Sequence, residues 1–203
     1  GITPRGGPVN VYALDFAGNG LKMIESMPHV GSVVPGDDTE RAVRLLRTLS
    51  EELSGRSERY SAVNASTIGD YRTLAGKPDE PRILLLLDGF SSFKGEFETS
   101  TATAPWYQVF IDLITEGRQV GMHVAITADR PGSVPTAVSS GIQRRLVLRM
   151  SDEQSYSMLD VPKDILDSSS PPGRGIIDGR ETQVAVVGGV ACEVEQSRDP
   201  IAL

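Results

Sequence analysis

The hydrophobic positions along the chain form short apolar runs separated by longer helical repeats. Three of the runs end in a polar residue: Val9 to Asp15, Ile83 to Asp88 and His123 to Thr127. A run that is apolar at consecutive positions predicts a strand buried on both faces, which is typical of parallel sheets. The run Ile83 to Asp88 reads ILLLLD and is the clearest of the three. We therefore expect it at the centre of a sheet.

Amphipathic repeats between these runs predict helices. After Asp37, Asp38 and Thr39, which are candidate N-caps, leucine and valine recur at steps of three or four residues, which predicts a helix of about 15 to 20 residues. Pro105 fits the first turn of another helix, which carries Phe110. The segment Ser91 to Ala104 is polar overall, and we expect a mobile loop there. The alternation of strands and helices predicts a three-layer α/β domain.

Shorter signals complete the pattern toward the C-terminus. Arg145 to Met150 predicts a strand, and Ser151 is a candidate cap for the helix that follows. Gly175 to Asp178 and Gln183 to Val187 predict a closing strand pair at a sheet edge. No internal repeat or linker divides the sequence, so we expect residues 1–203 to form one domain.

The composition is that of an ordinary globular domain, with 39% hydrophobic and 23% charged residues. The longest apolar run, Ile83 to Leu87, is far shorter than the roughly 18 residues of a membrane helix. The N-terminus shows no signal-peptide pattern, so we expect a cytoplasmic location, with any membrane attachment supplied by a partner or by further sequence. The single cysteine, Cys192, excludes an internal disulfide, and with His29 and His123 it gives no metal-site spacing.

The run that ends at Asp88 carries the sharpest chemical signal. Several apolar residues followed by an aspartate form the Walker B pattern, in which a buried strand delivers a carboxylate to the C-terminal edge of the sheet. Ligands of open α/β sheets bind at that edge. An aspartate there can orient Mg²⁺, often through water. The alternative is a strand-terminal aspartate that only caps the next turn.

A second segment favours the Walker B interpretation. Residues 117–131 read GRQVGMHVAITADRP. They resemble the part of FtsK/SpoIIIE-type ATPases in which a helix ends in a Gly-x-His turn and the following strand ends at a threonine shortly before Arg-Pro. The resemblance places Thr127 beside Asp88 on the neighbouring strand, where its hydroxyl would act as a sensor of the γ-phosphate or the attacking water. An ordinary strand-end threonine is the alternative.

The resemblance extends along nearly the whole chain, to FtsK/SpoIIIE domains of actinobacterial type VII secretion ATPases and their relatives. It implies a mostly parallel, RecA-like P-loop NTPase sheet, with ATP and Mg²⁺ as cofactors. It also implies other ATPase domains or subunits of the same protein-export motor as partners, and an exported protein as a further candidate. The other segments that carry it are Val9 to Leu21, Pro28 to Gly31, the helix at Glu40-Arg41, Asp88-Gly89-Phe90 and Pro171 to Gly175.

No Walker A motif accompanies these segments. A P-loop requires Gly-x-x-x-x-Gly-Lys-[Ser/Thr], so that backbone N–H groups and a lysine cradle the phosphates. Only one of the four lysines, Lys77, follows a glycine, and Pro78 comes next. In the family the P-loop strand precedes the region of Val9 to Asp15 and lies inside the sheet, so its loss would leave backbone groups of neighbouring strands unpaired. We therefore expect an incomplete domain, whose missing strand belongs to further sequence, to another polypeptide or to a rearranged segment.

Gly89 stands where active members of the family carry the glutamate that polarises the attacking water. Glycine has no side chain to act as a base. Glu96 and Glu98 lie too far along the segment to be taken as substitutes. We therefore expect a degenerate ATPase domain, weak or inactive as this isolated chain.

Arginines near the predicted strand Arg145 to Met150 are candidates for an arginine finger, which stabilises γ-phosphate charge in a neighbouring subunit. Arg144 and Arg145 are preferred over Arg149, and exposed strand-edge arginines are the alternative.

Three functions stay open from the sequence. The first is a motor ATPase domain of protein export. The second is a non-catalytic binding module that holds a nucleotide statically or docks the signal segment of a substrate. The third is a DNA translocase, which shares the fold. A net charge of −7 disfavours nucleic acid as a partner, because neutralisation of phosphates drives such binding.

Overall fold

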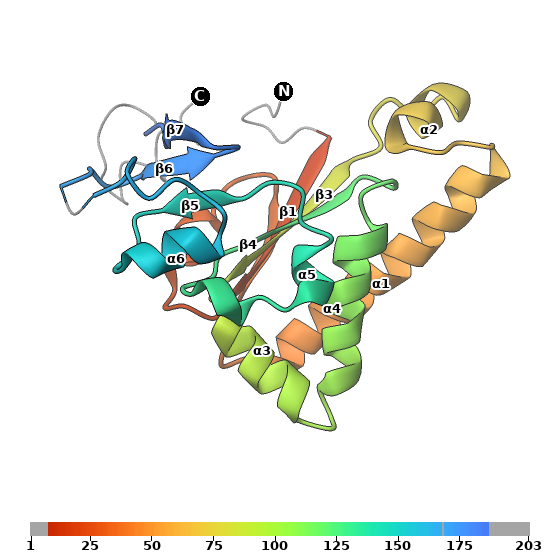
Figure 1. The fold of residues 1–203 in the computed structure, drawn as a ribbon. Helices are drawn as coiled ribbons and strands as arrows, with labels where there is room; N and C mark the ends of the chain where they lie inside the picture. Colours follow the sequence, from red (N-terminus) through yellow and green to blue (C-terminus); the bar gives the residue numbers. More distant parts are fainter. Residues whose placement is uncertain (1–7, 168, 187–203) are drawn as a thin grey trace.

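The computed structural model describes residues 8–167 and 169–186. Its main element is a parallel sheet with the strand order β2-β1-β3-β4 (Figure 1). The three apolar runs that end in a polar residue are neighbouring strands in this sheet, and β3 lies between β1 and β4. The interior position predicted for the ILLLLD strand is therefore confirmed. In sheet order the strands span Val30–Pro35, Val9–Asp15, Arg82–Asp88 and Met122–Ile126.

Helix α1, Thr39–Ala62, begins at the predicted cap, where the carboxylate of Asp38 accepts the N–H of Arg41 at 3.1 Å. At 24 residues the helix is longer than predicted. The buried stripe continues past the last leucine through Arg56 and Tyr60, which keep the spacing of three and four residues. An arginine carries no apolar signal, so the sequence pattern ended too early. The short helix α2, Ile68–Leu74, follows and is capped by Thr67.

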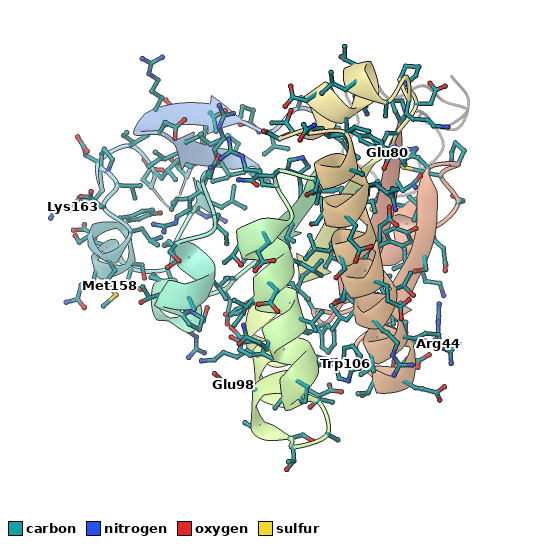
Figure 2. All side chains as sticks on the ribbon, turned by 90° about the vertical axis from the view of Figure 1, so that its right-hand side faces the viewer. Arg44, Glu80, Glu98, Trp106, Met158 and Lys163 are labelled. Atoms are coloured by element: carbon teal, nitrogen blue, oxygen red, sulfur yellow. The ribbon has the colours of Figure 1, made fainter. Side chains whose placement is uncertain are left out.

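The buried side chain of Arg56 connects α1 to the sheet. It is 1% exposed, and its Nε donates to Glu52 at 2.7 Å and lies 3.7 Å from Glu80. Figure 2 labels Glu80 beside α1. Its Nη1 donates to the carbonyl of Val120 at 2.9 Å. Hydrogen-bonded ionic partners are what allow a buried arginine to stay charged. Because Val120 lies two residues before the first residue of β4, this cluster holds the start of that strand against α1.

The segment Ser91 to Ala104 is not the loop that the sequence suggested. Helix α3 spans Phe90–Thr99, and its three phenylalanines are fully buried. The prediction was wrong because the phenylalanines lie three and four residues apart and so form one helix face, while the polar residues between them lie mostly toward solvent. The helix that follows, α4 (Ala104–Glu116), has Pro105 in its first turn as predicted and packs against α1 and α3.

The described residues cover the two faces of the main sheet unequally. On one face, alternate residues of β3 are buried in the core with the helices. On the other face Leu84 and Leu86 are only half-buried, and their register partners on β4, His123 and Ala125, are exposed. The sequence predicted that this apolar strand would be buried on both faces. Within residues 8–167 and 169–186, only one face of β3 is buried.

The main sheet ends at β4, since no strand in the described part of the chain pairs with its outer edge. The next strand, β5 (Leu146–Leu148), belongs to a separate antiparallel sheet with the order β5-β6-β7. The other two strands are β6, Arg174–Ile177, and β7, Arg180–Gln183. Tyr156 of helix α6, Glu153–Met158, packs into the small core on one face of this sheet.

Three details of this part of the chain correct the sequence prediction. The strand partner of β6 is β7, not Gln183 to Val187, of which Val187 lies outside the described residues. Asp178 and Gly179, both with positive φ, form a two-residue hairpin turn that was not recognised in the sequence. The cap of α6 is Asp152 rather than Ser151, and its carboxylate accepts the N–H of Ser155 at 2.9 Å.

Short helical segments complete the fold. They are the 3-10 turns Gly20–Ile24 and Pro131–Ser133 and the helix α5, Thr136–Ser139. None of the helices within residues 8–167 and 169–186 has both the length and the apolar character needed to cross a membrane.

Candidate functional site

The carboxyl ends of β1, β3 and β4 meet at one edge of the main sheet and bring three polar side chains together. Asp15 and Asp88 are register partners at the last positions of β1 and β3. Thr127 follows β4, and its N–H donates to the carbonyl of Leu87 at 2.9 Å. Its hydroxyl donates to Oδ1 of Asp88 and accepts the N–H of Gly89 at 2.9 Å. The structure thus places Thr127 directly beside Asp88.

Asp88 has one carboxylate oxygen available for a ligand. Thr127 occupies Oδ1, and no side chain or N–H in the described part of the chain donates to Oδ2. An oxygen of this kind suits Mg²⁺, which prefers hard oxygen ligands, keeps several waters and is completed by substrate phosphates. Residues 8–167 and 169–186 contain no cluster of three or more His, Cys, Asp or Glu side chains that could hold a metal. A magnesium ion at Asp88 would therefore have to be held mainly by water and phosphates, and the sequence contains no Walker A motif to bind those phosphates.

Asp15 was not among the site residues predicted from the sequence. Its carboxylate is occupied by hydrogen bonds from backbone N–H groups. Its side chain is 4% exposed, and its two oxygens accept four N–H bonds of 2.8–3.3 Å. The donors are Ala17, Gly18, Asn19 and Leu21. With four charge-assisted bonds, this carboxylate has little capacity left for a metal. The only sequence signal was an aspartate before a Gly-Asn-Gly turn, a common arrangement for a side chain that bonds to the following backbone.

Gly89 occupies a position that excludes a side chain. Its φ of 80° lies in the left-handed region. A Cβ at this position would come within 2.8 Å of the carbonyl carbon of Phe16 and 3.0 Å of the nitrogen of Ala17. The two segments are held together by the N–H of Phe16, which donates to the carbonyl of Asp88 at 2.8 Å. The backbone after β1 therefore fills the space that a side chain at position 89 would need.

Glu96 and Glu98 do not replace the missing carboxylate in this structure. Both lie on α3, where Glu96 accepts a hydrogen bond from the hydroxyl of Thr39 and Glu98 pairs with Lys94 at 3.4 Å. Glu96 is thus engaged by the start of α1 and Glu98 by a neighbour on its own helix.

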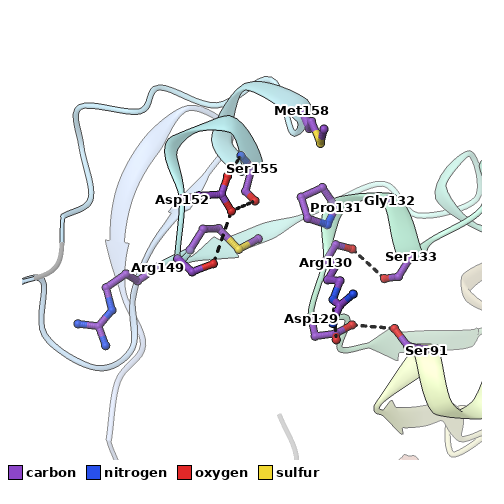
Figure 3. Close-up of a pocket in the computed structure, with 12 residues that line it drawn as sticks. Ser91, Asp129, Arg130, Pro131, Gly132, Ser133, Arg149, Asp152, Ser155 and Met158 are labelled. Carbon is purple, nitrogen blue, oxygen red and sulfur yellow. Dashed lines mark hydrogen bonds and ion pairs between the residues drawn. The ribbon is translucent and has the colours of Figure 1, made fainter.

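A cleft of about 980 Å³ lies beside this edge, between the turn after β4 and the turn after β5 (Figure 3). Its walls include Asp129, Arg130 and Arg149. The hydroxyl of Ser91 donates to Asp129 at 2.7 Å, and this hydrogen bond lowers the pKa of that carboxyl. The preferred arginine-finger candidates lie elsewhere: Arg144 and Arg145 are exposed before β5 and do not line the cleft.

Comparisons with known proteins give a consistent result. The profile of the FtsK/SpoIIIE family matches residues 4–170. The ESX-4 secretion system protein EccC4 of Mycobacterium tuberculosis is 30% identical over 98% of this chain, which spans only 16% of that relative's length.

Two solved structures show the same fold. EssC (ATPases 2 and 3) from Geobacillus thermodenitrificans has a TM-score of 0.82 at 21% identity, covering 98% of this chain and 37% of that one. EccC (ATPases 2 and 3) of Thermomonospora curvata, in complex with a signal sequence peptide, has a TM-score of 0.79 at 20% identity, covering 97% and 36%.

The parallel sheet predicted from the sequence is thus that of EssC and EccC ATPase domains. The relatives identified by sequence are type VII secretion proteins. The family profile covers most of the chain, and the similarity to EccC4 extends over nearly all of it. The chain belongs to the FtsK/SpoIIIE family.

Proposed function

We propose that this chain is the part of a type VII secretion ATPase domain that follows the P-loop, with Asp88 as its Walker B carboxylate and Thr127 as its sensor-like residue. The observation that carries the proposal is the hydrogen-bonded pair of Asp88 and Thr127 at the carboxyl ends of adjacent parallel strands. Ligands of open α/β sheets bind at this edge.

Two features of the sheet support an incomplete domain. The outer edge of β4 has no partner strand among the described residues, and the apolar face carrying Leu84 and Leu86 is only partly covered there. Backbone groups at a sheet edge and apolar faces of parallel strands are normally satisfied by further elements. A P-loop strand next to β4 and its helix over that face would supply both. Intact mass and peptide mapping of the native protein tests whether a Gly-Lys-[Ser/Thr] sequence belongs to the same polypeptide.

The residues of this chain then have separate roles toward a bound nucleotide. Oδ2 of Asp88 would accept a hydrogen bond from a water of the metal ion, and Thr127 fixes the orientation of that carboxylate. When bound, Mg²⁺ neutralises charge on the phosphates. Because Gly89 offers no base, we propose that the domain holds its nucleotide and hydrolyses it slowly or not at all. Arg144 and Arg145 are proposed to face a neighbouring ATPase domain.

A non-catalytic binding module is the second candidate. It is favoured because the backbone of Phe16 and Ala17 leaves no room for a catalytic side chain at Gly89. In that case the partners are other ATPase domains of the motor and an exported protein. The EccC structure in complex with a signal sequence peptide makes such a segment a reasonable ligand to test. A DNA translocase agrees less well with the net charge of −7.

An Asp88→Ala variant tests the nucleotide role in the full-length protein that contains these residues. We expect the affinity of this domain for ATP in the presence of Mg²⁺ to fall about tenfold or more, because a residue that orients a metal through water typically contributes that much. Titration calorimetry measures the change. Asp79→Ala, at an exposed aspartate before β3, is the matched control and should bind as the wild type does.

Equal affinities in the wild type and in Asp88→Ala would contradict the nucleotide role.

The 203-residue chain alone is expected to show no ATP turnover. Steady-state turnover above background that Asp88→Ala abolishes would contradict the proposed inactivity.

A further inference from the structure

The loop between β1 and the 3-10 turn at Gly20 is built around a single side chain. Asp15 accepts the N–H groups of Ala17, Gly18 and Asn19 at Oδ1 and that of Leu21 at Oδ2. The carboxylate is buried, so these bonds form in a medium of low dielectric, where they are strong. The backbone path of residues 16–21 is therefore set by Asp15.

This loop stands directly over Asp88. At its start, the N–H of Phe16 donates to the carbonyl of Asp88 at 2.8 Å. At its end, a Cβ added to Gly20 would lie 3.8 Å from Oδ2 of Asp88, and apart from its chain neighbours and the backbone of its own 3-10 turn no other heavy atom lies within 4 Å. Thr127 occupies the other carboxylate oxygen. Gly20 thus forms one wall of the space in front of the oxygen that is available for a ligand.

The distance between position 20 and Oδ2 bears on whether a water molecule can reach that oxygen. A water molecule that donates to a carboxylate stands about 2.7–2.8 Å from the oxygen. A methyl group 3.8 Å from Oδ2 would make ordinary contact with the carboxylate but would take up volume that such a water and its metal ion need. The absence of a side chain at position 20 therefore keeps this approach to Asp88 open.

We propose that Asp15 and Gly20 are positioning residues for the metal ion at Asp88. Asp15 fixes the backbone of the loop through its hydrogen bonds. The loop in turn places Gly20 where the lack of a side chain leaves room for a metal-bound water at Oδ2. This inference rests on the proposed role of Asp88. It assigns a function to two residues that a purely structural interpretation would treat as a turn.

The test uses Mn²⁺ with ATP as the probe and the full-length protein that contains these residues. Bound Mn²⁺ is followed by electron paramagnetic resonance, and the Asp88→Ala variant defines the share of the signal that belongs to this site. We expect Gly20→Ala to weaken Mn²⁺ binding at this site about tenfold, as is typical for residues outside the metal ligands that shape a site. Its unfolding temperature should not fall, because a Cβ at position 20 meets no clash.

Two controls separate positioning from a general effect on the fold. Gly95→Ala adds a methyl group in open space on α3 and should leave Mn²⁺ binding unchanged. Asp15→Asn keeps the size of the side chain but removes one acceptor, so it should weaken Mn²⁺ binding and lower the unfolding temperature. Asp38→Ala, which removes the capping side chain of α1, should lower the unfolding temperature without weakening Mn²⁺ binding.

The outcomes distinguish this inference from the proposed function. If Asp88→Ala removes the site and Gly20→Ala binds Mn²⁺ like the wild type, the positioning role is wrong and the nucleotide role stands. If only Asp15→Asn weakens binding, Asp15 merely holds the fold, which also overturns the inference. If Asp88→Ala leaves Mn²⁺ binding unchanged, the proposed function fails and the inference fails with it.

Discussion

A Gly89→Glu variant is expected to lose stability and to gain no ATP hydrolysis. A non-glycine residue in the left-handed region costs about 1–2 kcal/mol, and the steric contact with the backbone of Phe16 and Ala17 adds about 1–3 kcal/mol. We therefore expect the free energy of unfolding to fall by about 2–5 kcal/mol, measured by chemical denaturation of the variant and the wild type. Steady-state ATP turnover of the full-length protein should stay at the wild-type level.

The matched control for this variant is Gly76→Glu. Gly76 also has a left-handed backbone, with a φ of 62°, but a Cβ there would meet nothing within 4 Å. Its loss of stability should be limited to the backbone cost of about 1–2 kcal/mol. Equal losses at positions 76 and 89, together with increased turnover in Gly89→Glu, would show that the loop after β1 yields and that position 89 accepts a catalytic carboxylate.

The predicted parts of the fold are those that depend on local pattern. The run ILLLLD predicted β3 correctly, because a short apolar run bounded by polar residues is typical of a strand inside a parallel sheet. The pairing of Asp88 with Thr127 was implied by the resemblance to FtsK/SpoIIIE ATPases, and the structure places the two side chains together. The phenylalanines of α3 were missed because the polar residues between them dominate the composition of the segment.

The parts that could not be predicted depend on contacts between distant segments. Nothing in the sequence indicates that the backbone at Phe16 closes the space beside Gly89, which is 73 positions further on. The role of Asp15 was missed for a related reason, since its partners are backbone N–H groups that any residue supplies. The sequence thus predicted the two side chains that meet at the strand ends, whereas the backbone loop beside them became visible only in the structure.

Phe93→Ala is expected to be among the most destabilising single substitutions in the chain. Phe93 is fully buried, and its ring lies 4.6 Å from that of Phe97 and 4.8 Å from that of Phe110, with Phe16 edge-on at 5.4 Å. Removing a buried phenylalanine side chain costs about 3–5 kcal/mol, because apolar contacts are lost and a cavity remains. Chemical denaturation of the full-length protein and of this chain measures the loss.

Met158→Ala is the control for this loss. It should change stability by less than about 0.5 kcal/mol, since Met158 is 72% exposed.

The same substitution at Phe93 should also affect the site. Phe16 is the first residue of the loop whose N–H groups bind Asp15, and its ring packs edge-on against that of Phe93. Phe93→Ala should therefore also weaken Mn²⁺ binding at Asp88 under conditions in which the protein is still folded. Phe110→Ala removes a comparable buried ring that does not pack on Phe16, so it should lower stability by a similar amount and leave Mn²⁺ binding closer to wild type. Equal effects of the two variants on Mn²⁺ binding would show that the aromatic core supports the sheet as a whole rather than the loop over Asp88.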